Sequence, residues 1–368
     1  MNKNILLLLD GFSKGIIYPV IFLVFLFKLL FKGRRISSSN GRYLLIKIMG
    51  GGNLISWIDV LPWESCDILT AKSNSEILKI FSASAGNVFI DTNRFLGLAF
   101  STLYLLRLYW RGQYDCIINM ESESAFAKLI SITVPSKRVV GITNIYRSVI
   151  DRIVYDEYMV SPYVLSRKDS ISQIVHFHPK RNTNFLTIVN SHQEVFKSKF
   201  ENYIPNDIII APTCSEVDEL RRMPNSFWKL FFGRIHNSFY EKITIIFPSK
   251  NDPQYSFFHN LAASIGGIKI ALTGYEEFIY MIKNAGLVVT LDSQALHVAQ
   301  LFKVPAIAFY GPTSPIGVDL RDTTYPLTAG LQCSPCTHKY FVKPCNDSAY
   351  CTQTSYLSYE LPFLQRHD

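Results

Sequence analysis

Strand-like and helix-like segments alternate along this chain, and the alternation runs twice. The first series opens with the apolar strand Tyr43–Met49, and the second opens with Ile208–Ala211. Segments that alternate in this way fold into a parallel sheet with helices on both faces. The length of 368 residues agrees with two domains, at roughly 100–200 residues per domain. We therefore expect an α/β fold with two sheets in tandem.

The pattern also predicts where the individual segments lie. Expected strands are Tyr43–Met49, Asp67–Thr70, Asn87–Ile90, Cys116–Asn119, Arg138–Gly141, Ile208–Ala211, Ile243–Phe247, Ile268–Leu272, Leu287–Thr290 and Ala306–Tyr310. Expected helices are Phe95–Trp110, Ser124–Ile132, Asn182–Phe200, Asn225–Asn237, Tyr255–Ile265, Tyr275–Asn284 and Ala295–Phe302. The resulting division is an anchor and linker at 1–40, a Rossmann-like domain at 41–190, a linker at 191–206, a second Rossmann-like domain at 207–345 and a tail at 346–368.

The N-terminus indicates a membrane element. Residues 16–27 form a continuous apolar run, and Lys28, Lys32, Arg34 and Arg35 follow it. A spanning helix needs about 20 apolar residues, so the run suffices only if Lys28 is tolerated. A single short span and a monotopic or re-entrant helix in one leaflet both fit, and a buried helix of the soluble body is the third interpretation. In either membrane case the basic flank predicts a body on the cytoplasmic face.

The net charge of +8 limits the partners. A basic chain binds nucleic acid, an anionic membrane surface or an anionic substrate. No zinc-finger, RNA-recognition or helix-turn-helix signature occurs in the sequence, so we expect no nucleic-acid partner. A membrane and an anionic substrate remain, and the two can hold together.

Two loops of the second series carry polar and small residues where strands end. Asp292 and Ser293 stand at the start of a helix, and His297 lies one turn further on. Free N–H groups at a helix start favour an anion such as a diphosphate. The next strand ends at Gly311-Pro312-Thr313, on the same expected sheet edge. In the first series, Gly50, Gly51 and Gly52 form a loop of the same kind, although this loop alone is a weak signal.

These residues carry a family resemblance. The run DSQALHVAQLFKVPAIAFYGPTSP resembles the C-terminal motif of glycosyltransferase family 9, the heptosyltransferase-like enzymes of GT-B fold. Three further segments resemble other parts of that family: LLIKIMGGGNLI, YDCIINMESESAFAKL and IIIAPTCSEVDELRRMPNSFWKLF. The resemblance extends from Tyr43 to Cys351, which is nearly the whole body.

The resemblance implies an inverting glycosyltransferase. It would move heptose or another hexose-like sugar from a nucleotide-diphosphate donor to a lipid-linked or lipopolysaccharide-type glycan at the cytoplasmic face of the bacterial inner membrane. The first domain would hold the acceptor, with Gly50, Gly51 and Gly52 as its loop, and the second the nucleotide-sugar. No cofactor would be required for catalysis. The implied donor-binding residues are Asp292, Ser293, Gln294, His297, Arg221, Thr213, Gly311 and Thr313.

Two positions depart from the family pattern. Asn53 stands where the family has the aspartate presumed to be the general base, and an amide cannot accept the proton. Gln294 replaces a glycine and narrows the donor pocket. Three explanations stay open: Glu121 or Glu123 acts as the base, positioning alone drives the reaction, or the chain is an inactive nucleotide- or glycan-binding subunit of a surface-polysaccharide assembly.

The seven cysteines separate into two groups. Cys66, Cys116 and Cys214 lie in apolar or mixed contexts and are expected in the core. The other four have C-x2-C-x8-C-x5-C spacing, and the first pair fits a zinc knuckle. A structural zinc and packed free thiols are the two interpretations. The residues concerned are Cys333, Cys336, Cys345 and Cys351.

Overall fold

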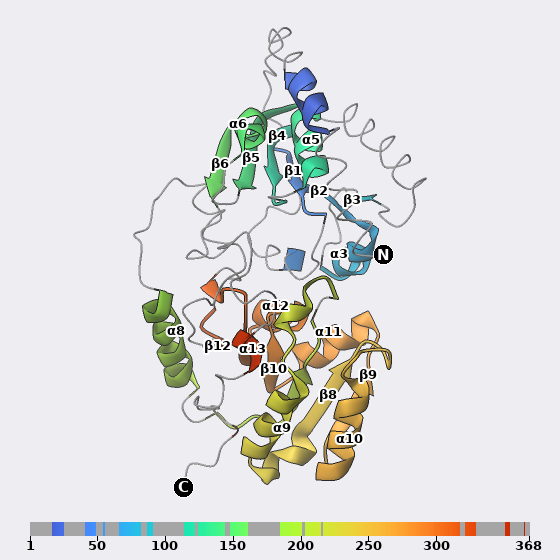
Figure 1. Cartoon of the computed structure of the whole chain (residues 1–368), viewed down its shortest axis with the longest axis vertical. Helices are drawn as coiled ribbons and strands as arrows, with labels where there is room; N and C mark the ends of the chain where they lie inside the picture. Colours follow the sequence, from blue (N-terminus) through green and yellow to red (C-terminus); the bar gives the residue numbers. More distant parts are fainter. Residues whose placement is uncertain are drawn as a thin grey trace. The chain divides into compact units, whose positions relative to one another are not determined.

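The computed structural model divides the chain into two compact units, and each is described by itself (Figure 1). The first unit comprises Met1–Pro162 and Ser170–His178, and the second Tyr163–Asp169 and Pro179–Asp368. The structure describes residues 17–25, 41–48, 54–55, 66–81, 87–90, 114–121, 124–143, 148–160, 185–200, 203–214, 216–316, 321–328, 350–353 and 364.

The first unit is built on a six-stranded sheet, sheet A, with the order β3-β2-β1-β4-β5-β6. All neighbouring strands are parallel. The strands are β1 (Tyr43–Ile46), β2 (Cys66–Ala71), β3 (Asn87–Ile90), β4 (Tyr114–Asn119), β5 (Ser136–Thr143) and β6 (Glu157–Val160). The described helices of this unit are residues 17–25, η2 (Lys72–Asn74), α3 (Ser75–Phe81), α5 (Ala125–Thr133) and α6 (Val149–Val154).

The second unit repeats this topology. Sheet B has the order β12-β11-β10-β7-β8-β9, which is sheet A's order read from the other edge, and its pairings are also parallel. Its strands are β7 (Ile208–Ala211), β8 (Ile243–Phe247), β9 (Lys269–Leu272), β10 (Leu287–Leu291), β11 (Ala306–Tyr310) and β12 (Thr324–Thr328). Its helices are α8 (Phe185–Lys199), η3 (Glu216–Arg221), α9 (Asn225–Arg234), η4 (Asn237–Lys242), α10 (Tyr255–Ile265), α11 (Tyr275–Lys283), α12 (Gln294–Leu301) and α13 (Tyr350–Gln353).

The predicted α/β class with parallel sheets is confirmed. Every expected strand forms, and α10 has the expected bounds. Five further elements were not expected from the sequence: β6, β12, α3, α6 and α13. The expected helix Phe95–Trp110 lies outside the described residues.

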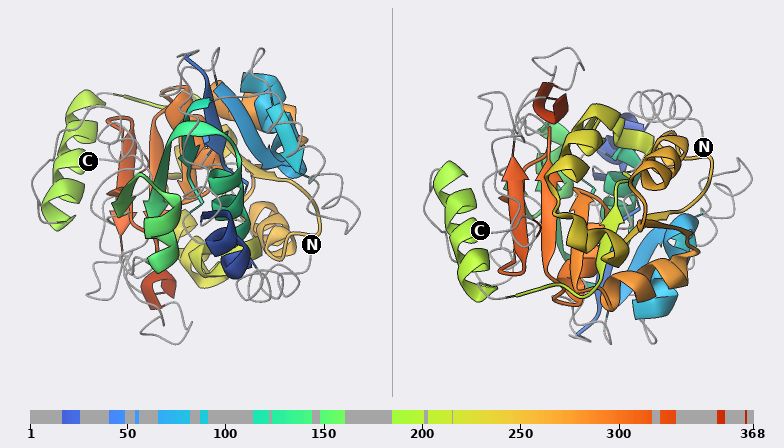
Figure 2. Two further views of the ribbon diagram at one scale, coloured as in Figure 1. Left: turned by 90° about the horizontal axis from the view of Figure 1, so that it is seen from above. Right: turned by 90° about the horizontal axis from the view of Figure 1, so that it is seen from below.

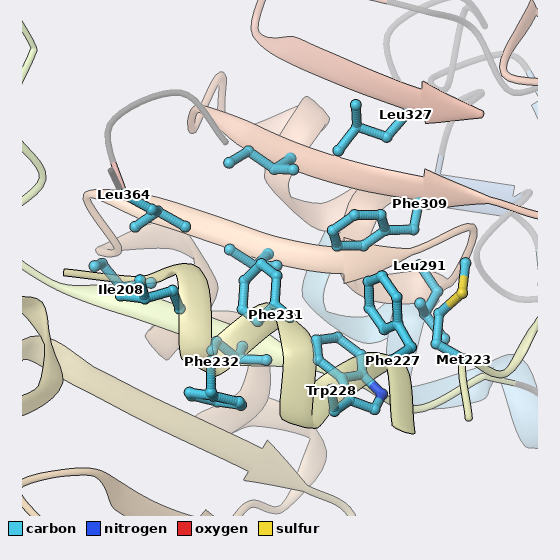
Figure 3. Close-up of a cluster of buried hydrophobic side chains, with 14 of the residues drawn as sticks. Ile208, Met223, Phe227, Trp228, Phe231, Phe232, Leu291, Phe309, Leu327 and Leu364 are labelled. Carbon is cyan, nitrogen blue, oxygen red and sulfur yellow. The ribbon is translucent and has the colours of Figure 1, made fainter. Parts of the chain in front are cut away.

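Aromatic side chains dominate the core of the second unit. Trp228 on α9 is fully buried and meets Phe231, Phe258 and Phe309 edge to face. Figure 3 shows these α9 side chains against strands of sheet B. Aromatic pairs in this geometry contribute about 0.5–1.5 kcal/mol each beyond their buried area. The tryptophan of the family-like segment PNSFWKLF is therefore a packing residue.

Buried thiols in the first unit confirm part of the cysteine interpretation. Cys66 and Cys116 are both buried. Burial raises the pKa of the Cys66 thiol to about 12 and also raises the pKa of Cys116. Because the thiolate is the reactive form, both side chains are inert parts of the core near neutral pH. Cys214 is half-buried.

Helix α8 belongs to the second unit. It lies along β12, as Figure 2 shows, and Gln193 Nε2 donates to the Pro326 carbonyl at 2.6 Å. Phe196 is fully buried in the core of this unit and lies 5.5 Å from the Tyr325 ring. The segment 191–206, expected as a linker, thus includes the end of a helix that packs on sheet B.

Residues 17–25 form a helix that packs on the first unit. Ile21 is fully buried, in one cluster with Leu44 and Ile46 of β1, Ala127 and Ile130 of α5 and Val154 of α6. Part of the apolar run thus forms a helix that packs on the core of the first unit. Within the described residues, no helix combines the length and apolarity needed to cross a bilayer.

Candidate functional site

The strand order of each sheet marks one place for a site. In sheet A the order reverses between β1 and β4, and in sheet B between β7 and β10. Ligands of open α/β sheets bind beyond the carboxyl ends of the strands at such a switch point. The two candidate sites are therefore the residues that follow β1 and β4, and those that follow β7 and β10.

At the switch point of sheet A a lysine and a glutamate form an ion pair. Ile46 and Asn119 are register partners at the ends of β1 and β4. Lys47 and Glu121 follow them, and Lys47 Nζ lies 2.8 Å from Glu121 Oε1. Their side chains are 7% and 12% exposed, so the pair is largely shielded from water. Glu121 was expected from the sequence as a candidate base, whereas Lys47 was not expected at the site.

Neighbouring groups fix the turn that carries Glu121. Its backbone N–H donates to Asn119 Oδ1 at 2.9 Å, and Asn119 Nδ2 donates to Ser131 Oγ of α5 at 2.9 Å. On the β1 side, Lys47 N donates to the Leu69 carbonyl of β2 at 2.9 Å. Glu121 is therefore held in place through both its backbone N–H and its carboxylate.

Several predicted residues of the first unit lie outside the described residues. These residues are Gly50, Gly51, Gly52, Asn53 and Glu123. The described part of the candidate acceptor site thus consists of Lys47, Asn119 and Glu121.

At the switch point of sheet B, Arg221 and Asp292 come together from distant parts of the chain. Arg221 ends η3, and its Nη1 donates to the Asp292 carbonyl oxygen at 2.6 Å. The same nitrogen lies 3.5 Å from Asp292 Oδ2. Asp292 follows β10 and is 6% exposed. The arginine therefore fastens the β10–α12 turn to η3 and brings a positive charge to this edge.

The next residue, Arg222, is an arginine too, and its side chain has a different partner. Its Nη1 lies 3.1 and 3.3 Å from the two carboxylate oxygens of Asp252. Asp252 precedes α10 and also accepts from the backbone N–H of Gln254 at 2.9 Å. The structure thus distinguishes the two arginines, since Arg221 alone of the pair contacts Asp292.

Ser293 is the N-cap of α12, but its hydroxyl does not cap the helix. It lies 3.0 Å from Thr290 Oγ1, which itself donates to the Ala211 carbonyl at 3.0 Å. The Ser293 hydroxyl therefore donates to Thr290 in this structure, and the first-turn N–H groups of α12 are not satisfied by its side chain. Such N–H groups attract an anion. The backbone N–H groups, rather than the Ser293 hydroxyl, are thus the groups available here to donate hydrogen bonds to a diphosphate.

Gln294 has a partner that the sequence did not reveal. Its Nε2 donates to Tyr275 Oη at 2.7 Å. Tyr275 begins α11, which follows β9 at the same edge of sheet B. The amide that replaces the family's glycine is thus held by a second side chain. Tyr275 could have been noticed as an aromatic residue that follows a glycine, three positions after the end of the expected strand at Leu272.

His297 and Thr213 complete the described residues near this edge. His297 lies on α12 and is 4% exposed. Thr213 follows β7 and is half-buried.

The loop after β11 packs against the C-terminal helix α13. A Cβ built on Gly311 would lie 2.6 Å from Thr352 Cγ2 and 3.4 Å from Cys351 Sγ of α13, and 3.8 Å from the Leu220 carbonyl. Only a residue without a side chain fits this close approach. Among the described residues, the buried Thr313 Oγ1 finds no hydrogen-bond partner. A ligand oxygen would satisfy it.

We expect Gly311→Ala to displace α13 from the loop. The new methyl group overlaps Thr352, and overpacking costs about 1–3 kcal/mol. Chemical denaturation would show a lower free energy of unfolding for Gly311→Ala. A Gly311→Ala/Thr352→Ser double variant should regain most of the lost stability. If the free energy of unfolding of the double variant equalled that of Gly311→Ala, the overlap with Thr352 would not be the cause.

The candidate zinc site is not described as a whole. Cys333, Cys336 and Cys345 lie outside the described residues, and Cys351 is a buried residue of α13. Within the described residues, no cluster of three or more potential metal ligands occurs.

Comparison with known proteins identifies this arrangement. Residues 105–345 match the family model described as glycosyltransferase family 9 (heptosyltransferase). No curated protein matches the chain in sequence.

Solved structures share the fold at low identity. A glycosyltransferase of family 9 from Veillonella parvula DSM 2008 is 14% identical, with a TM-score of 0.57, over 83% of this chain and 92% of its own. The E. coli heptosyltransferase WaaC with ADP is 13% identical, with a TM-score of 0.54, over 77% of this chain and 92% of its own. The E. coli ADP-heptose LPS heptosyltransferase II is 13% identical, with a TM-score of 0.53, over 78% and 90%.

Proposed function

The chain belongs to glycosyltransferase family 9 and is a glycosyltransferase, and we propose that it moves a sugar from a nucleotide-diphosphate donor onto a lipid-linked glycan. One observation carries this proposal: Arg221 fastens the Asp292 turn at the switch point of sheet B, beside the start of α12. A guanidinium and helix N–H groups, together at the carboxyl ends of the strands of one sheet, are groups that bind a diphosphate.

The solved relatives support a nucleoside-diphosphate sugar as donor. One E. coli structure holds ADP and another holds ADP-2-deoxy-2-fluoro heptose. We propose ADP-heptose as the first donor to test. Gln294, tied to Tyr275, stands in the donor pocket that the family resemblance implies, so we expect the preferred sugar to depend on this pair.

For the acceptor, we propose that Glu121 replaces the missing family carboxylate. It would take the proton of the acceptor hydroxyl as that oxygen bonds to the anomeric carbon of the donor. The bond from that carbon to the nucleoside diphosphate breaks, and attack from the opposite face inverts the configuration. The Lys47 ammonium, 2.8 Å away, supports this role because it fixes the carboxylate at the strand edge.

The direct test is transfer by the purified full-length protein. ADP-heptose and other nucleotide-sugars would be offered with a lipopolysaccharide-core acceptor, and both released nucleoside diphosphate and glycan mass would be measured. We expect release that depends on the acceptor and falls in Asp292→Ala. Nucleotide binding without turnover of any donor would contradict the catalytic proposal and support a binding subunit instead.

A further inference from the structure

We propose that the helix at residues 17–25 lies in the plane of an anionic membrane and is held there by the first unit. Its membrane-facing surface, the apolar anchor face, consists of Pro19, Val20, Phe22 and Leu23. The proposal uses the proposed function only to explain why such an anchor is useful, since a lipid-linked acceptor is confined to that plane.

One side of this helix is a packing surface. Ile21 is fully buried in the core cluster of the first unit, and four partly buried residues of the same helix pack against that cluster. At 3.6 residues per turn, one face of the helix carries Ile17, Tyr18, Ile21, Val24 and Phe25. The helix is therefore part of the folded first unit along this face.

The opposite side is apolar and open. Leu23 is 63% exposed, Phe22 48% and Val20 39%, and Pro19 is exposed as well. No charged or hydroxyl-bearing residue interrupts these four positions. A helix that is apolar all round needs an apolar partner on each side. The core of the first unit supplies one partner, so the anchor face calls for a second.

The flanking charge favours an anionic bilayer as this partner. Lys28, Lys32, Arg34 and Arg35 follow the helix in the sequence, and the net charge of the chain is +8. Apolar residues on one side of a helix with basic residues beside it are the pattern of interfacial helices. Each basic residue near an anionic surface adds to the attraction. A second protein copy with the same basic flank would instead meet like charge.

The packing of Ile21 distinguishes this arrangement from a span. A spanning helix has to expose its whole circumference to lipid or to other membrane helices. Here Ile21 would have to leave the core of the first unit, which would open a cavity beneath it. The structure thus favours an in-plane helix over the single short span that the sequence alone leaves open.

Vesicle binding tests the anchor face. Full-length protein would be floated with phosphatidylglycerol-rich vesicles and with purely phosphatidylcholine vesicles. We expect strong binding to the first, and a loss of about tenfold in partitioning for Leu23→Glu and more for Phe22→Glu/Leu23→Glu. The matched control is Leu230→Glu on α9, because Leu230 is 48% exposed in the second unit and should leave binding unchanged. Equal losses for Leu23→Glu and Leu230→Glu would overturn the proposal.

Stability tests the in-plane geometry. Ile21→Ala should lower the Tm of the protein without vesicles by about 5–10 °C, because it empties a core position, whereas Val20→Ala should not. Alkaline carbonate should release the protein from vesicles. An unchanged Tm for Ile21→Ala, or retention after carbonate, would overturn the in-plane arrangement.

Two further measurements separate the alternatives. If sedimentation shows that Leu23→Glu converts a dimer to a monomer and vesicle binding is absent, the face binds a second copy and the proposal fails. Transfer to a water-soluble, deacylated acceptor should be unaffected in Leu23→Glu. Loss of vesicle binding with intact transfer in Leu23→Glu would support the membrane anchor. Wild-type protein that transfers sugar but does not bind vesicles would contradict the anchor and leave the proposed function standing.

Discussion

Arg221→Ala is expected to lower kcat/KM for the donor by about 100- to 1000-fold, which is the usual cost of removing one preorganised donor from an anion site. The variant loses the 2.6 Å hydrogen bond to the Asp292 carbonyl and the positive charge at the edge of sheet B. Steady-state kinetics with varied nucleotide-sugar would measure the loss, and circular dichroism would check folding. Arg221→Lys should recover part of it, because a lysine restores the charge but not the planar fork.

Arg222→Ala is the matched control for this prediction. It removes an arginine next in the chain whose partner is Asp252, away from Asp292. We expect it to lower the free energy of unfolding, because both side chains are largely shielded from water. Its KM for the donor should stay within about twofold of wild type, a change below 1 kcal/mol, because Arg222 does not contact Asp292. A larger kinetic defect in Arg222→Ala than in Arg221→Ala would contradict the assignment.

Glu121→Gln should lower kcat by about 100- to 10,000-fold, the range that a general base contributes. The amide keeps the size of the side chain and can still contact Lys47, but it cannot accept the proton. We expect the acceptor KM to change little. The rate would be measured at saturating donor, with the acceptor varied so that kcat and KM are separated.

Lys47→Met provides the companion variant. It leaves the largely shielded Glu121 carboxylate without its 2.8 Å partner, so the free energy of unfolding should fall by about 3–5 kcal/mol. The Glu121→Gln/Lys47→Met double variant should be more stable than Lys47→Met alone, because it also removes the carboxylate charge that Lys47 had balanced. Transfer by Glu121→Gln within threefold of wild type would remove Glu121 as the base. Asn53→Asp would then test whether the family position still accepts a carboxylate.

Sequence patterns anticipated the fold where strands are continuously apolar. Runs such as Ile208–Ala211 and Ala306–Tyr310 are buried on both faces, so composition alone marks them. The strands β6 (EYMV) and β12 (TYPLT) were missed because polar residues and a proline interrupt them. β12 nevertheless forms, because it pairs with β11 alone at the edge of sheet B, where a proline is tolerated.

The chemistry of the candidate sites was less accessible to sequence reasoning. Asp292 and Arg221 were singled out, yet nothing in the sequence separated Arg221 from Arg222, because the direction of each side chain depends on how η3 lies against β10. The pairs Lys47–Glu121 and Gln294–Tyr275 join residues that are 74 and 19 positions apart. Such contacts follow from strand register and loop geometry, which local patterns do not encode.

The contact between α8 and β12 can form only after the ribosome has made β12, long after it has made α8. Gln193 of α8 reaches Pro326 of β12, 133 residues later in the chain. At about 5–20 residues per second, a ribosome needs on the order of 10 s to make that interval. Throughout it, Tyr325 of β12 is not yet there to pack against Phe196 of α8. The second unit can therefore complete its sheet edge only late in synthesis, and α8 is the segment of the nascent chain that we expect chaperones to protect.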